Sequence, residues 1–152
     1  MALALAWVAL AAGCGSGGDG GGAATDTSQL ARPERSLQSE LEAAVEHLGL
    51  PARDGMRVAP TRCDDRAAND VTSGYRLRLE LGAGGDTGQL LRRAERFWRD
   101  RGRHVRVVGA KSTFPAVFAT ADPGWTFSLQ LFPERGEALL SGGTPCLPDP
   151  KP

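Results

Sequence analysis

The residues of this 152-residue chain most readily put to chemical use are two histidines and three cysteines. His47 and His104 have no evident nucleophile to activate, because the sequence holds no Gly-x-Ser-x-Gly segment. The cysteines are Cys14, Cys63 and Cys146, and neither Cys-x-x-Cys nor His-x-x-x-His spacing occurs to hold a metal ion. These patterns predict a protein that is not an enzyme and uses no metal or cofactor. A hydrolase site assembled from distant residues stays open as an alternative.

A glycine-rich segment at residues 82–88, GAGGDTG, stands between a predicted strand and a predicted helix, where nucleotide-binding folds hold a phosphate. The Gly-x-Gly-x-x-Gly fingerprint needs a glycine at Thr87, and a P-loop needs Gly-Lys-Ser/Thr where Thr87-Gly88-Gln89 stands. Asp86 at the start of the helix would also repel an anion. The segment is therefore interpreted as a turn that caps a helix.

Oxygen-bearing side chains cluster after Cys63, at Asp64, Asp65, Asn69 and Asp70. Their spacing fits no EF-hand loop. An acidic loop without an ion is the better interpretation, with a calcium site as the alternative.

The N-terminal residues resemble a targeting segment. Residues 2–13 are uncharged and mostly apolar, and 12 helical residues span about 18 Å, short of the roughly 30 Å hydrocarbon core of a bilayer. This length favours a signal peptide over residues 1–13. Residues 14–32 include six glycines and show no apolar period, which predicts a flexible tether.

The run Leu10-Ala-Ala-Gly-Cys14 resembles the lipobox of bacterial prolipoproteins, in which a signal peptidase cuts just before an invariant cysteine. An arginine bias of 16 Arg to 2 Lys and the closing Ser141-Gly-Gly-Thr-Pro-Cys146 extend the resemblance to actinobacterial envelope lipoproteins. The resemblance implies a diacylglyceryl group on Cys14, and two acyl chains anchor a protein firmly. The expected location is the extracytoplasmic face of the cell membrane. Because no basic residue precedes the apolar run, we expect the translation start to lie upstream of Met1.

Once Cys14 is assigned to the lipid, Cys63 and Cys146 remain as an even pair in an exported protein. Such a pair favours a disulfide bond. The bond would join the segment before the first predicted strand to the C-terminal tail, and the chain-entropy model gives it on the order of 4 kcal/mol of stability. Two buried free thiols are the alternative.

Hydrophobic spacing predicts two helices. The first covers residues 33–48 and ends at Gly49. The second begins after Asp86, which forms a capping pair with Gln89, and ends at Gly102. Its expected inward residues are Leu90, Leu91, Ala94, Phe97 and Trp98.

Strict alternation over residues 75–81 predicts a strand whose buried face carries Tyr75, Leu77, Leu79 and Leu81. Residues 51–74 show no period and are predicted to form a long loop. Further strands are expected over 104–109, 115–120, 125–131 and 137–141. Most of the aromatic residues from Phe97 onward are expected in the core. The order predicts a single α+β domain over 33–152, with a mainly antiparallel sheet of about five strands and two helices packed on one face.

Positive and negative residues number 18 each, so the net charge does not indicate a nucleic-acid binder. An arginine excess is nevertheless concentrated on the second predicted helix and the strand after it. Near anionic lipid, each basic side chain of a tethered domain contributes about 1 kcal/mol. Contact with anionic lipid or a wall polymer is therefore one hypothesis, and a solvated helix face is the plainer one. The residues concerned are Arg92, Arg93, Arg96, Arg99 and Arg103.

These inferences predict a lipid-anchored extracytoplasmic lipoprotein that acts as a non-catalytic binding or cell-envelope module. A carrier of a small apolar or lipid-like ligand is the alternative, since a sheet curved around its helices could enclose an apolar cavity. A small envelope hydrolase is the rival from another functional class.

Overall fold

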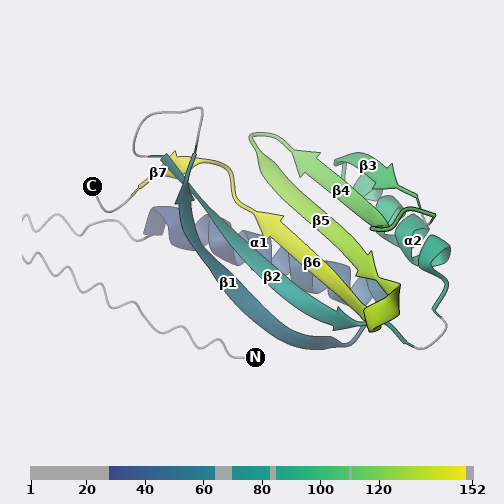
Figure 1. The fold of residues 1–152 in the computed structure, drawn as a ribbon. Helices are drawn as coiled ribbons and strands as arrows, with labels where there is room; N and C mark the ends of the chain where they lie inside the picture. The colour runs from purple at the N-terminus through teal and green to yellow at the C-terminus, as the bar shows by residue number, and fades with distance from the viewer. Residues whose placement is uncertain (1–27, 64–69, 83–84, 110, 150–152) are drawn as a thin grey trace, which may run out of the picture.

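The computed structural model describes residues 28–63, 70–82, 85–109 and 111–149 (Figure 1). The predicted signal peptide, Cys14 and residues 14–27 of the predicted tether lie outside the described residues, as do Asp64, Asp65 and Asn69. The elements in chain order are α1 (Ser28–Leu48), β1 (Ala52–Arg62), β2 (Asp70–Glu80), α2 (Thr87–Asp100), β3 (His104–Val108), β4 (Ala116–Ala121), β5 (Trp125–Phe132), the short 3-10 helix η1 (Pro133–Arg135), β6 (Glu137–Gly143) and β7 (Leu147–Pro148).

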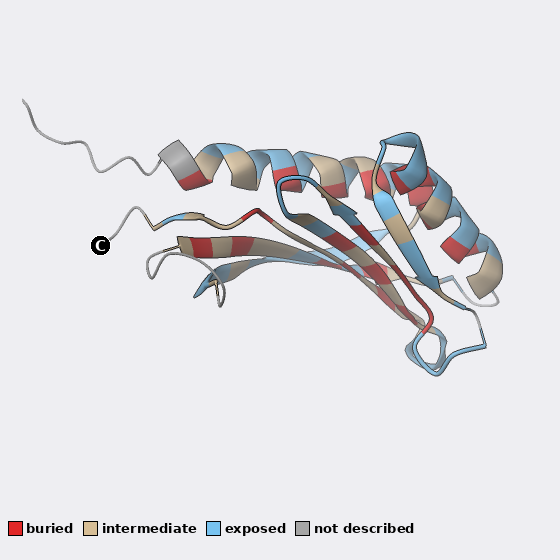
Figure 2. Cartoon of the chain, turned by 90° about the horizontal axis from the view of Figure 1, so that it is seen from above, coloured by how far each residue is buried: buried red, intermediate tan, exposed pale blue. Residues whose placement is uncertain are grey.

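The α+β class is confirmed, and the sheet is larger than expected. It has seven strands instead of about five, in the order β1-β2-β6-β5-β4-β3, with β7 paired to β2. All neighbouring strands are antiparallel. Both helices cover the same face, and the buried residues lie where helices and sheet meet (Figure 2).

The two additional strands are β1 and β7. Residues 52–62 form β1, so the prediction of a loop over 51–74 was wrong. At this edge of the sheet every residue of β1 except Val58 is exposed, and its side chains do not alternate between apolar and polar. Backbone pairing with β2 holds the strand in place, and such pairing leaves no mark on side-chain type.

Helix α1 begins at Ser28, so residues 28–32 belong to the helix and not to the tether. Pro33 therefore lies inside the helix instead of in its first turn. The extension contributes one buried side chain, Leu30, that is 7% exposed. Gly49 ends the helix as predicted, with a φ of 63°.

Helix α2 confirms its sequence signals in detail. The Asp86 side chain accepts a hydrogen bond from the backbone N–H of Gln89 at 3.0 Å, which caps the first turn. Gly102, with a φ of 69°, follows the last turn. The buried residues of the helix are those expected: Leu90, Leu91, Ala94, Phe97 and Trp98.

Candidate binding face of the sheet

No helix of the described part of the chain covers one face of the sheet, and we call this face the open face. Along β2, Leu77 and Leu79 are buried beneath α1, and Tyr75 packs at the edge of the same core. Side chains of a strand alternate between faces, so Arg76 and Arg78 point to the open face, and both are exposed. Antiparallel sheets often have a solvated face of this kind.

Backbone register aligns one row of open-face residues across six strands. Arg76 on β2 lies opposite Ser141 on β6, and Ser141 lies opposite Ser128 on β5. The row continues from Ser128 to Phe118 on β4 and Arg106 on β3. Met56 on β1 completes it beside Arg76. Six residues, one from each of these strands, thus share one line.

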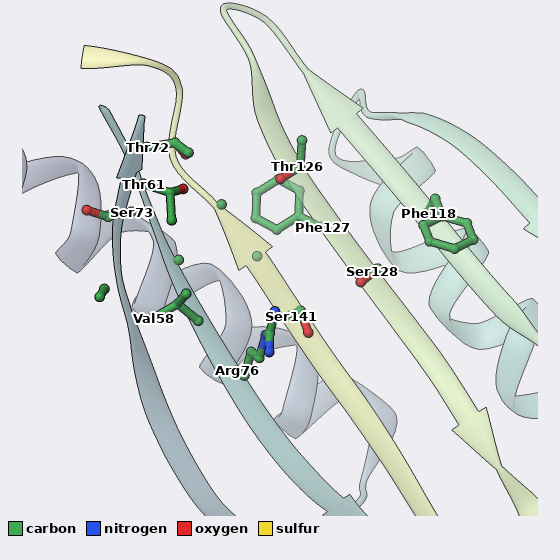
Figure 3. A pocket seen from close by; sticks show the side chains of 14 residues that line it. Val58, Thr61, Thr72, Ser73, Arg76, Phe118, Thr126, Phe127, Ser128 and Ser141 are labelled. Carbon is green, nitrogen blue, oxygen red and sulfur yellow. The ribbon is translucent and has the colours of Figure 1, made fainter. Parts of the chain in front are cut away.

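A hollow of about 330 Å³ lies on the open face around this row (Figure 3). The surface is depressed at the centre of the hollow because the residues there are small. They are Gly74 on β2, and Ser141 and Gly143 on β6. Larger side chains border it, including Phe118 and Arg76. Of the described residues that line this hollow, Arg76 alone carries a charge.

Among the described residues Arg76 has no carboxylate partner, unlike Arg53, Arg57 and Arg78 of the β1–β2 hairpin. Arg53 binds Glu80 at 2.7 Å and Glu137 at 3.1 Å, and the hydrogen bond to Glu80, with the carboxylate charge, raises the pKa of Arg53. The remaining partnered arginines of the hairpin are Arg57 with Glu34, and Arg78 with Asp54. Within the described chain, Arg76 forms no ion pair and no hydrogen bond through its side chain.

Hydroxyl-bearing side chains line the same hollow as Arg76. The hydroxyls of Ser128, Ser141 and Thr126 have no hydrogen-bond partner among the described residues. Thr72 is engaged, since its Oγ1 donates to the backbone oxygen of Thr144 at 2.7 Å. The hollow therefore offers one cation and several free donors and acceptors to solvent or to a ligand.

Most of the seven aromatic residues from Phe97 onward lie in the core or pack against it, as expected, and three lie on the open face. The four at the core are Phe97, Trp98, Trp125 and Phe127. Phe118 is half-buried, with the Arg106 guanidinium 4.6 Å from its ring centre. Phe132 is half-buried and contacts Phe114 at 6.4 Å between ring centres, and Phe114 is 63% exposed. Period-2 alternation could have identified Phe132, because it lies out of phase with the buried residues of β5, whereas Phe118 shares its phase with the buried Ala116 of β4.

Two further hollows extend along the open face. One of about 580 Å³ shares Arg76 with the first and also contacts Met56, Leu139 and Phe132. The other, of about 570 Å³, shares Phe132 and Arg135 with the second and reaches Phe114. The open face is thus hollowed in three adjoining places.

The five arginines predicted for anionic contact do not form one free surface. Arg93 donates to the backbone oxygen of His47 at 2.7 Å, at the C-terminus of α1. Arg99 pairs with Glu95 at 2.8 Å, and Arg103 lies 3.5 Å from Glu40. Arg92 and Arg96 are exposed and have no ion-pair partner within the described chain.

The remaining candidate residues are placed as follows. Cys63 and Cys146 are joined by a disulfide bond with their Cα atoms 6.3 Å apart. His47 lies in the last turn of α1 and His104 begins β3, and both are exposed. Among described residues, no three His, Cys, Asp or Glu side chains gather where they could hold a metal ion.

Comparison of the chain with protein-family models, curated proteins and solved structures finds no match. No helix among the described residues combines the length and apolar character that crossing a bilayer requires.

Proposed function

We propose that this protein is a lipid-anchored extracytoplasmic lipoprotein that acts as a non-catalytic binding module of the cell envelope and binds its ligand on the open face. The observation that carries the binding role is the hollow around Arg76, an unpartnered guanidinium beside free hydroxyls on an uncovered sheet face. The anchor rests on the similarity of residues 10–14 to a lipobox.

The residues of the hollow have the chemistry of recognition. A guanidinium, several hydroxyls and an aromatic ring can orient a ligand through hydrogen bonds and packing. Among the described lining residues there is no carboxylate, imidazole or thiol that could transfer a proton or attack a substrate. This set of side chains favours binding over catalysis.

The cysteine pair supports an exported location. Disulfide bonds persist mainly in oxidising compartments such as the exterior of a bacterial membrane. The sheet brings Cys63, after β1, beside Cys146, before β7, although 83 positions separate them in sequence. Their pairing fits the compartment that the lipobox implies.

Substitution of the cysteine in the lipobox tests the anchor. We expect Cys14→Ser to move the protein from the membrane fraction to the soluble fraction of the producing bacterium, with loss of the diacylglyceryl mass from the purified product. The double variant Cys63→Ser, Cys146→Ser is the matched control, because it removes the other two cysteines together without touching the lipobox and should leave membrane retention unchanged. Recovery of the unsubstituted protein from the cytosol with a bare Cys14 thiol would contradict the proposal.

A carrier of an apolar ligand is the second candidate. The observation that favours it is the apolar part of the open face, where Met56 is 59% exposed and Phe114 is 63% exposed. Both residues line hollows that also contain Phe132. Mass spectrometry of lipids that co-purify with the protein from native membranes separates the two candidates, since a carrier should retain a defined lipid in stoichiometric amount.

A further inference from the structure

We propose that the hollow around Arg76 binds an anionic group, carboxylate or phosphate, carried on an extended hydroxyl-bearing polymer chain, a saccharide or a polyol, that lies across the strands of the open face. The ligand class rests on the proposed function, because an extracytoplasmic protein faces the polymers of the envelope. The site itself rests on the described residues alone.

The positive charge of Arg76 in the hollow favours an anionic ligand. Arg76 alone among its described lining residues is charged, and no acidic side chain of the described chain neutralises it. An arginine guanidinium offers paired donors that match a carboxylate or phosphate bidentately. On the same hairpin, Arg53, Arg57 and Arg78 are already held by carboxylates. Arg76 is therefore free to bind an external anion. Arg62, at the end of β1, also has no partner among the described residues, but it does not line the hollow.

The row of open-face residues fits an extended ligand. Neighbouring strands lie about 4.8 Å apart, so Phe118, three strands from Arg76, is about 14 Å away, and Arg106 is about 19 Å away. Ser141 and Ser128 stand between them. A chain that crosses the strands along this row would place an anion at Arg76 and hydroxyl-bearing units over the two serines.

The side chains between the two ends suit a saccharide or a polyol. The free hydroxyls of Ser141, Ser128 and Thr126 can each donate and accept, which matches the hydroxyl groups of sugar or polyol units. Gly74 and Gly143 carry no side chain into the hollow, and the side chains of Val58 and Thr126 lie beside them. Phe118 adds an apolar surface, and Arg106 lies over its ring and holds a second positive charge at the far end of the row.

The hollowed shape favours a chain over a membrane surface. A bilayer presents a broad surface that contacts protruding side chains, whereas a single polymer chain can enter a depression of about 330 Å³. The adjoining hollow, which shares Arg76, gives the chain room to continue. Arg92 and Arg96, which the sequence suggested for contact with an anionic surface, lie instead on α2, in the helical layer.

Calorimetric titration of the full-length protein tests the site. The probes are a galacturonate hexamer, a glycerol phosphate hexamer and neutral maltohexaose, so that carboxylate, phosphate and uncharged chains are compared at the same number of units. We expect at least one anionic hexamer to bind in a salt-sensitive manner, and maltohexaose to bind at least tenfold more weakly. Binding of the galacturonate or the glycerol phosphate chain identifies which anion the site prefers.

Substitution of Arg76 locates the bound anion. We expect Arg76→Met to weaken binding of the anionic hexamer by about 10- to 100-fold, the usual loss for a charge-assisted hydrogen bond. Arg76→Lys, which retains charge and loses bidentate geometry, should give a smaller loss and guards against misfolding of the first variant. Arg92→Met removes the same charge from α2 and should leave affinity within twofold.

Several results would overturn the inference. These are equal binding of neutral and anionic hexamers, failure of both anionic hexamers to bind, equal losses for the Arg76 and Arg92 variants, or Arg76-dependent binding to vesicles that contain anionic lipid but to neither hexamer. The last result would assign the open face to a membrane. Lipidation of Cys14 is measured separately, so an anchored protein that binds no hexamer refutes the ligand alone, and a bare Cys14 with intact hexamer binding refutes the anchor alone.

Discussion

Adjacent glycines on β6 serve opposite faces of the sheet. A Cβ atom at Gly142 would lie 2.5 Å from Leu37 Cδ1 and 3.3 Å from the Thr126 backbone oxygen, so α1 packs directly against the bare backbone there. A Cβ atom at Gly143 would meet the Thr126 hydroxyl at 2.8 Å, and Gly143 lines the open-face hollow. The first glycine is needed for the contact between helix and sheet, and the second keeps the hollow open.

Alanine at these two positions should therefore have different effects. We expect Gly142→Ala to lower the free energy of unfolding by about 1–3 kcal/mol, because Leu37 is buried and must shift within a packed core. Gly143→Ala should cost less stability, because the exposed Thr126 side chain can rotate away. Urea unfolding of both variants measures the difference. Equal losses at the two positions would refute this assignment of faces.

At the scale of elements, the end of the β1–β2 hairpin is joined to the C-terminal segment by several contacts. The disulfide bond links Cys63 to Cys146, and β7 pairs with the start of β2. The buried Thr144 accepts a hydrogen bond from the Ser73 backbone N–H at 3.0 Å through its Oγ1. These contacts hold the exposed strand β1 in place at one end, beside the hollow of the open face.

Removal of the disulfide bond should destabilise the protein as a whole. We expect the double variant Cys63→Ser, Cys146→Ser to lose about 2–5 kcal/mol, since 83 positions separate the cysteines and the open chain gains conformational freedom when unfolded. Urea unfolding of the variant and of the oxidised parent gives the difference. A reducing agent should destabilise the parent and leave the variant unchanged, and a variant as stable as the parent would contradict the prediction.

At the scale of the whole molecule, both helices and the sheet share a single buried cluster. Leu41 of α1, Trp98 of α2 and Leu129 of β5 are all 0% exposed and belong to it. Trp98 also stacks on Phe127 of β5, with ring centres 6.3 Å apart. Because α1, α2 and the sheet bury their apolar surfaces against one another, neither helix has a core of its own.

This shared core predicts cooperative unfolding. We expect far-ultraviolet circular dichroism and tryptophan emission to report the same urea midpoint, with emission shifting to longer wavelength as Trp98 becomes exposed. The oxidised protein is the appropriate sample, because reduction adds a second equilibrium. Separate midpoints for the two signals would show that a helix leaves the sheet before the rest of the fold is lost.

The sequence was most informative where local periodicity and core packing agree. Spacing alone predicted the five buried residues of α2, its Asp86 cap and the inward residues of β2. It succeeded because the apolar stripe of the helix is the face that packs against the sheet. Strand β1 could not be found in this way. Its side chains are nearly all exposed, so backbone pairing determines its structure.

The candidate site was out of reach of sequence reasoning for a related reason. Alternation along the strand could predict that Arg76 and Leu77 point to opposite faces of the sheet. The number of cysteines could predict that Cys63 and Cys146 form a pair in an exported protein. Only strand order and register set Arg76, Ser141, Ser128 and Phe118 in one row, because β2 pairs with the distant β6 and the register of β4, β5 and β6 depends on their pairing. Local pattern determined which way each side chain points, and tertiary pairing decided which side chains meet.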